Sequence, residues 1–317
     1  MLSRVADSLY WMSRYLERAE HTGRLVDVHL NLMLDQSAAS AEQRWSRVLA
    51  ALGHPVAPLS QIEPYALAQT LTFDMANHSS VAACISSARE NARQVREQIS
   101  SEMWEELNRL FHEVKRADME NLWETEPLEF LRVVKEGVHL FHGVTDSTMS
   151  HGEGWQFIQF GRYIERASSV AALIDVHFGF FPAVASEAFD QVEWIGLLRS
   201  CTAFESYCKV YTPELKADRI AEFLLLNAEF PHSVRFAVDR VRASLEAIQE
   251  FTNSRKADHV SRLAGRLRAL LGYGQIHEIM VGGLHSYLTD IQRQCAEINR
   301  CAHELYVSYP VEAALEA

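Results

Sequence analysis

Apolar residues recur along the first 33 positions at alternating steps of three and four, the period of one face of an α-helix. This stripe consists of Leu2, Val5, Leu9, Met12, Leu16, Ala19, Gly23, Val26, Leu30 and Met33. The opposite side keeps the same spacing but is apolar only at its ends, with Tyr10, Arg14, Glu17, His21, Leu25, Val28 and Leu32. A helix with two apolar sides is expected to be largely buried, so its charged belt must be paired.

A second helix of the same design is predicted near the middle of the chain. Its first stripe is Phe157, Phe160, Ile164, Ala167, Ala171, Ile174 and Phe178, and its second is Ile158, Arg162, Glu165, Ser169, Leu173, Val176 and Phe180. Two interpretations of the charged belts stay open. Either each belt is an arginine–glutamate ion pair that fixes the register between central helices, or the belts line a polar cleft in which arginines hold an anionic group.

The two helices also share their sequence. RYLERA at residues 14–19 and RYIERA at residues 162–167 lie 148 positions apart, and nine of the sixteen positions from 14 to 29 are identical at this offset. Shorter echoes follow in the same order, such as GVHLF in the first half and GLHSY in the second. We therefore predict a tandem duplication with copies near 1–150 and 151–317, packed as one unit.

Helix boundary signals punctuate the chain, and no strand pattern of alternating polarity stands out. Gly53 is a stop signal, and Pro127 suits the first turn of a helix that we expect to end at Gly143. Only 8 prolines and 14 glycines occur in 317 residues, which favours long helices joined by short loops. The predicted fold class is all-α, a helical bundle built from two tandem homologous halves.

Composition narrows the classes of function. The chain is 48% hydrophobic and 23% charged, as in ordinary globular proteins, and its formal net charge of −12 argues against a general nucleic-acid binder. Its five cysteines never show CxxC spacing, so neither a disulfide framework nor a thiolate zinc site is expected. No signal-peptide pattern and no apolar stretch of roughly 18 residues occurs. We expect a cytoplasmic protein without membrane or nucleic-acid partners.

Two further groups carry candidate chemistry. Arg89, Glu90 and Arg93 fall within little more than one helical turn, either as site residues or as a solvated helix face. Glu136 and His139 have the i,i+3 spacing of half a dinuclear carboxylate metal site, but the counterpart of the glutamate in the second copy is a glycine. No P-loop, GxSxG, HExxH or GxGxxG motif occurs, so no cofactor is predicted.

Longer motifs resemble a known family. MLSRVADSLYWMSRYLERAEHTGRLVDV, SARENARQVREQISSEMWEELN and VKEGVHLFHGVTDSTMSHGEGWQFIQFGRYIERA are similar to the bacterial alpha-E domain family, as are LLLNAEFPHSVRFAV and GLHSYLTDIQ. The resemblance covers essentially the whole chain. It implies an all-helical protein fused to, or encoded beside, a circularly permuted ATP-grasp protein, with transglutaminase-like and sometimes proteasome-like peptidases nearby. This association implies a system that makes or modifies peptide or amide bonds.

The resulting hypothesis is a helical component of a cytoplasmic ATP-grasp-dependent amide-ligase or peptide-modification system, which binds that partner and holds an amino-acid or peptide substrate. A self-sufficient helical enzyme and a scaffold without a site are the alternatives. The candidate catalytic glutamates are Glu17, Glu90 and Glu165. The candidate substrate-binding residues are Arg14, Arg18, His21, Arg89, Arg93 and Arg166, and the candidate metal ligands are Glu136 and His139.

Overall fold

The computed structural model describes residues 1–33, 41–55, 58, 62–117, 127–179, 187–212, 214–252 and 258–306. Phe180 of the second predicted stripe lies outside these ranges. Within them every regular element is an α-helix and no strand occurs, so the all-α class is confirmed. The helices are α1 (Ser3–Leu32), α2 (Ala41–Ala51), α3 (Pro64–Phe73), α4 (Val81–Gln94), α5 (Ser101–Arg116), α7 (Pro127–Thr148), α8 (Glu153–Gly179), α9 (Glu187–Ser200), α10 (Phe204–Tyr211), α11 (Ala217–Leu226), α12 (Val234–Thr252), α13 (Asp258–Tyr273), α14 (Ile276–Gly282) and α15 (Leu284–Tyr306).

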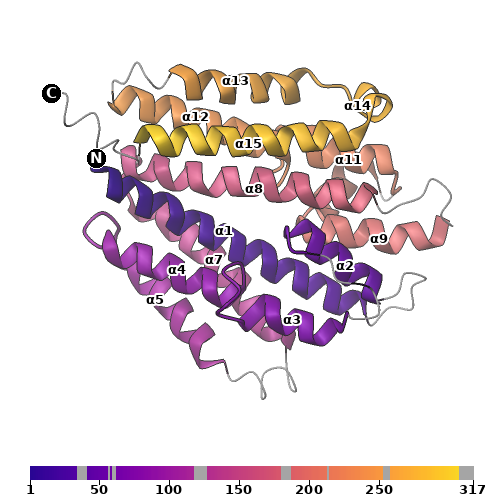
Figure 1. Ribbon diagram of the computed structural model, residues 1–317, viewed down its shortest axis with the longest axis horizontal. Coiled ribbons are helices and arrows are strands. Elements are labelled where there is room, and N and C mark those ends of the chain that lie inside the picture. Colours follow the sequence, from indigo (N-terminus) through magenta and orange to yellow (C-terminus); the bar gives the residue numbers. More distant parts are fainter. Residues whose placement is uncertain are drawn as a thin grey trace.

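The two helices with charged belts, α1 and α8, lie side by side at the centre of the bundle (Figure 1). They run in the same direction, because Met1 lies beside Glu153 near their N-terminal ends and Arg14 lies beside Glu165 farther along. Helices α4, α5 and α7 pack together on the α1 side, and α12, α13 and α15 pack together on the α8 side. The backing helices thus follow in the same chain order in both halves, while the duplication itself stays a prediction.

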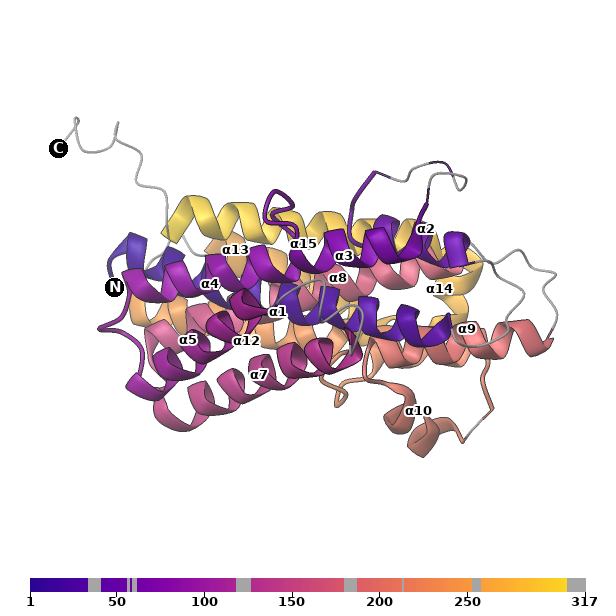
Figure 2. The same ribbon diagram turned by 90° about the horizontal axis from the view of Figure 1, so that it is seen from below.

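The shorter helices gather away from the N-terminus. Helices α2, α9, α11 and α14 lie toward the opposite end of the bundle, and Figure 2 shows α10 at the edge beside α9. One hydrophobic cluster includes buried side chains from both halves, such as Leu9, Phe141, Ile164 and Leu288. In the described part of the chain, no helix has an apolar stretch long enough to cross a membrane.

A glycine sets the distance between the two central helices. Gly161 on α8 lies so close to α1 that a Cβ atom at this position would come within 2.4 Å of the Tyr10 carbonyl oxygen and 2.3 Å of Ser13 Oγ. Contacts this short with a backbone atom cannot be relieved by rotating a side chain. Gly161 therefore permits the close approach that brings the charged belts of α1 and α8 together.

The predicted helix boundaries around α7 are half correct. Pro127 occupies the first turn as predicted, but the helix does not end at Gly143 and continues to Thr148. Thr145, in the added turn, is buried, and its hydroxyl donates to the carbonyl oxygen of Phe141. A single helical glycine costs only about 1 kcal/mol relative to alanine, so packing of the next turn overrides the stop signal.

Candidate functional site

The charged belt of α8 meets two arginines of α1. Glu165 accepts hydrogen bonds from Nε of Arg14 at 2.7 Å and from Nε of Arg18 at 2.7 Å. Arg14 also donates through Nη1 to Tyr10 Oη at 3.1 Å and to Asn299 Oδ1 of α15 at 3.2 Å. The Glu165 side chain is buried, whereas the Arg18 side chain retains 25% of its exposure. This side of the network therefore reaches the surface through Arg18.

The belt of α1 meets two arginines of α8 in the same manner. Glu17 accepts a forked pair of hydrogen bonds from Nε and Nη2 of Arg166, and its Oε2 lies 3.7 Å from Nε of Arg162. Nη1 of Arg166 donates to the carbonyl oxygen of Pro231 at 3.1 Å, in the turn before α12. The Arg166 and Glu17 side chains are almost fully buried.

Each glutamate is thus bound by arginines of the other helix, and not by the arginine of its own belt. The exchange follows from the parallel alignment of α1 and α8, which sets the two belts against each other. We call these six residues the crossed centre: Arg14, Glu17, Arg18, Arg162, Glu165 and Arg166. Of the predicted site residues, the structure brings five together here: Arg14, Glu17, Arg18, Glu165 and Arg166.

The crossed centre is poorly suited to proton abstraction. Burial alone would raise the pKa of Glu165, but the charges and hydrogen bonds of Arg14 and Arg18 outweigh it and hold the pKa below its usual 4.5. A general base works best when its pKa lies near the operating pH, so a carboxylate fixed in its ionised form by two guanidinium groups is a weak one. Two carboxylates also face four guanidinium groups, which leaves an excess of positive charge.

A second set of ionisable residues borders Glu17. Glu20 pairs with Arg24 one turn along α1, and Nε2 of His139 lies 3.6 Å from the same carboxylate. Nε2 of His142 on α7 lies 4.0 Å from Glu17 Oε2 and makes no hydrogen bond within the described residues. Burial, followed by the charge of nearby arginines, lowers the pKa of His142 well below its usual 6.5, which keeps the ring neutral.

The family to which the chain is matched is described by a motif that occurs in the crossed centre. A family model for Alpha-E, described as a predicted alpha-helical domain with a conserved ER motif, matches residues 1–307. The chain belongs to the Alpha-E family. The dipeptide Glu-Arg occurs at Glu17–Arg18 and again at Glu165–Arg166. In this Alpha-E protein both dipeptides therefore belong to the crossed centre.

Three curated relatives are similar to this Alpha-E protein over most of its length. They are uncharacterized proteins of Mycobacterium bovis (strain ATCC BAA-935 / AF2122/97) and of the CDC 1551 / Oshkosh and ATCC 25618 / H37Rv strains of Mycobacterium tuberculosis, each 24% identical over 314 residues. The alignments cover 91% of this chain but 34% of each relative, so the chain spans about a third of their length. No solved structure matches the chain significantly.

The other predicted site residues lie outside the crossed centre of the Alpha-E protein. Arg89 donates to Asn108 at 2.6 Å and lies over the Phe111 ring of α5. Glu90 and Arg93 are exposed and pair with each other, which is the solvated helix face that the sequence left open.

The remaining predicted site residues are His21 and the proposed metal ligands Glu136 and His139. His21 is buried beside the centre, and burial lowers the pKa of its ring. Glu136 is exposed and pairs with Arg132 at 2.6 Å, while its proposed co-ligand His139 faces Glu20. The glutamate and the histidine therefore contact different partners, Arg132 and Glu20.

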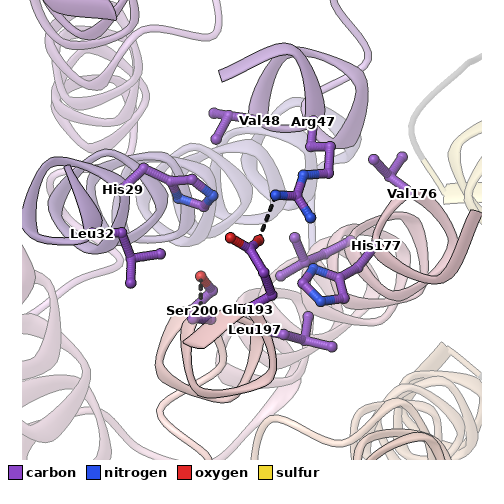
Figure 3. A pocket seen from close by; sticks show the side chains of 11 residues that line it. His29, Leu32, Arg47, Val48, Val176, His177, Glu193, Leu197 and Ser200 are labelled. Carbon is purple, nitrogen blue, oxygen red and sulfur yellow. Dashed lines mark hydrogen bonds and ion pairs between the residues drawn. The ribbon is translucent and has the colours of Figure 1, made fainter. Parts of the chain in front are cut away.

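A second buried ion cluster lies between the ends of α1, α2, α8 and α9 (Figure 3). Glu193 of α9 accepts from Nε of Arg44 at 2.8 Å and from Nη2 of Arg47, both on α2. His29 and His177, which occupy corresponding positions of the two halves, line a cavity of about 20 Å³ beside it, room for about one water molecule. Burial lowers the pKa of His29 to about 4.

The Glu20–Arg24 pair and the Glu193 cluster were not singled out from the sequence, for different reasons. Glu20 and Arg24 show the i,i+4 spacing of an ion pair, and this signal could have identified them. Glu193 precedes Trp194 as Arg44 precedes Trp45, and these two tryptophans lie 149 positions apart, close to the offset of 148 between the two hexapeptides. Nothing in a single sequence, however, indicates that α2 and α9 meet.

Proposed function

We propose that this Alpha-E protein is the helical partner module of a cytoplasmic ATP-grasp-dependent system that forms or modifies amide bonds. In this proposal it binds a circularly permuted ATP-grasp protein and holds an amino-acid or peptide substrate, while the ATP-grasp protein activates the carboxylate. A transglutaminase-like or proteasome-like peptidase acts on the same peptides. The relatives support a role beside another domain, because the region similar to this chain is only about a third of their length.

The observation that carries a holding role, in preference to a catalytic one, is the pairing of both buried glutamates with arginines. Removing a proton from an attacking amine requires a carboxylate able to accept it, and the lowered pKa of Glu165 opposes this. Binding of an anion requires surplus positive charge, which four guanidinium groups around two carboxylates supply.

Arg18 is the residue through which such an anion is held. Its side chain is the most exposed of the four arginines, and its hydrogen bond to Glu165 uses Nε. A guanidinium group has further N–H donors on its terminal nitrogens, and these can bind the carboxylate of an amino acid or peptide while the Glu165 contact is kept.

The test is reconstitution of the two proteins. We expect the Alpha-E protein to co-purify with the ATP-grasp protein encoded beside it, and the pair to consume ATP in a manner that depends on added amino acids or peptides. Arg18→Gln should raise the substrate concentration needed for half-maximal activity and leave co-purification intact. Glu90→Gln, on the exposed face of α4, is the matched control and should change neither.

The outcomes separate the alternatives. Product formed by the Alpha-E protein without the ATP-grasp protein would replace this proposal with a self-sufficient enzyme. If the two proteins are active together and Arg18→Gln needs the same substrate concentration for half-maximal activity as the wild type, the result would point to an assembly scaffold. Failure of two abundant, folded proteins to associate or to stimulate each other would contradict the proposal as a whole.

A further inference from the structure

A group of three different metal-binding side chains lies where α13 packs against α15. His259 stands at the start of α13, and Glu297 and Cys301 lie one turn apart on α15. One ring nitrogen, one carboxylate oxygen and the sulfur lie within 4.8 Å of one another. In the described part of the chain this group is distinct from the crossed centre and from Glu136, which no such group includes.

The donor set is selective. Thiolate and imidazole ligands favour zinc and related transition metals over magnesium or calcium, and three protein ligands with one open position are common in zinc sites that keep a bound water. A pair of ligands spaced i,i+4 on one helix faces the same direction, so α15 needs only one ligand from α13 to surround a cation. The exposed His259 leaves a route for entry from solvent, whereas Cys301 is buried.

The carboxylate of Glu297 is held in place by its neighbours on α15. Arg300 donates to Glu297 through Nε at 3.2 Å and Nη2 at 2.6 Å, which fixes the orientation of the carboxylate. A carboxylate has lone pairs enough to keep an arginine while it binds a metal, and metal-binding carboxylates are commonly held by such outer partners. The Cys301 thiol donates to Glu297 Oε1 at 3.4 Å, so the sulfur and the carboxylate already face each other across one turn of α15.

We propose that His259, Glu297 and Cys301 bind one divalent cation of the zinc class, with water as the fourth ligand. Binding replaces the S–H bond of Cys301 by a sulfur–metal bond and releases that proton to solvent, while His259 contributes a ring nitrogen and Glu297 a carboxylate oxygen. The cation joins the beginning of α13 to the last turns of α15. CxxC spacing is absent because the ligands come from two helices, so the spacing that argued against a thiolate site does not apply.

The experiment is a titration of the full chain, stripped of metal by a chelator, with Co²⁺ and then with Zn²⁺. We expect one Co²⁺ per chain with a thiolate-to-cobalt charge-transfer absorption, its displacement by Zn²⁺, and a melting temperature that rises with Zn²⁺. Loss of a residue that only hydrogen-bonds to a metal ligand weakens metal binding by roughly 10- to 100-fold, and removing one of the three ligands should weaken it by more than that. Affinity should also fall as pH decreases, because a proton competes for the sulfur.

Matched variants decide the outcome. Cys301→Ser should abolish the charge-transfer absorption, and His259→Gln should weaken binding while the thiolate signal remains at high Co²⁺. Cys208→Ser on α10 and His277→Gln on α14 remove the same residue types elsewhere and should change neither quantity. Absence of the absorption in the wild type, or its persistence in Cys301→Ser, would overturn the proposal. Neither result bears on the ATP-grasp partnership.

Discussion

The two glutamates of the crossed centre occupy corresponding positions, yet their surroundings differ. Glu165 is bound by Arg14 and Arg18, beside Tyr10 and Asn299, and this side reaches the surface through Arg18. On the other side, α7 and the turn before α12 close over Glu17 and its partner Arg166. Only 5% of the Arg166 side chain is accessible.

The difference teaches where a repeated motif is structural and where it can bind. The same hexapeptide produces the same exchange of ion pairs, but the other helices decide how far each pair is desolvated. A buried ion pair is strongly destabilising to break, whereas a partly exposed one contributes little to stability and can exchange partners. We therefore expect the Glu17 side to hold the helices together and the Arg18 side to bind ligands.

The largest effect should come from neutralising Glu17. Glu17→Gln removes the carboxylate that pairs with the largely buried Arg162 and Arg166, and breaking a buried pair in this way costs ~3–5 kcal/mol of the free energy of unfolding. Glu165→Gln should cost less, about 1–3 kcal/mol, because Arg18 is nearer to solvent than either arginine that binds Glu17. Denaturant unfolding measures both, and equal losses would remove the distinction between the two sides.

The next effect tests the approach of α1 to α8, on which both sides depend. Gly161→Ala puts a methyl group against the Tyr10 carbonyl oxygen, and overpacking of this kind typically costs ~1–3 kcal/mol. Gly143→Ala is the control, because nothing lies within 4 Å of its added Cβ atom on α7. Helix propensity then predicts a gain of up to ~1 kcal/mol, so the two alanines should shift the melting temperature in opposite directions.

A pH titration can separate the two sides. The folded-state pKa of His142 lies below 6.5, so only the unfolded chain takes up a proton as pH falls below that value, and stability drops by up to ~1.4 kcal/mol per pH unit. The carboxylate of Glu165, whose pKa is lowered, keeps its contribution above about 4.5 and loses it only as pH falls further. Between pH 7 and 5 the dependence therefore reports on the histidines.

His142→Gln should flatten the stability profile between pH 7 and 5 in urea unfolding experiments. Other buried histidines keep part of the slope, since burial also lowers the pKa of His21 and His29. His151→Gln, at an exposed position beside Trp155, is the control and should leave the slope unchanged. An unchanged slope in His142→Gln would show that this ring is not held neutral beside Glu17.

Much of the fold and part of the centre could be predicted from the sequence. The steps of three and four predicted α1 and α8, and charge between apolar ends marked Arg14, Glu17 and Glu165, because a period of 3.6 is set by local geometry alone. The exchange of partners could not be predicted, since it depends on the direction in which α8 runs beside α1. Spacing alone can also mislead. Arg89, Glu90 and Arg93 are spaced like the residues of a site, yet Glu90 and Arg93 lie on a face of α4 that meets solvent.

The smallest effect on stability should accompany the largest effect on binding. Arg18→Gln keeps the Arg14 contact to Glu165 and changes a side chain that is already a quarter exposed, so the loss should stay within the ~1 kcal/mol typical of exposed pairs. If the open side of the centre holds an anion, the same variant should nevertheless weaken binding of amino acids or peptides to the reconstituted pair. Calorimetry and unfolding on one preparation compare the two quantities directly. A large loss of stability would assign Arg18 to the same structural role as Arg166, and the two sides of the centre would then differ in exposure without differing in function.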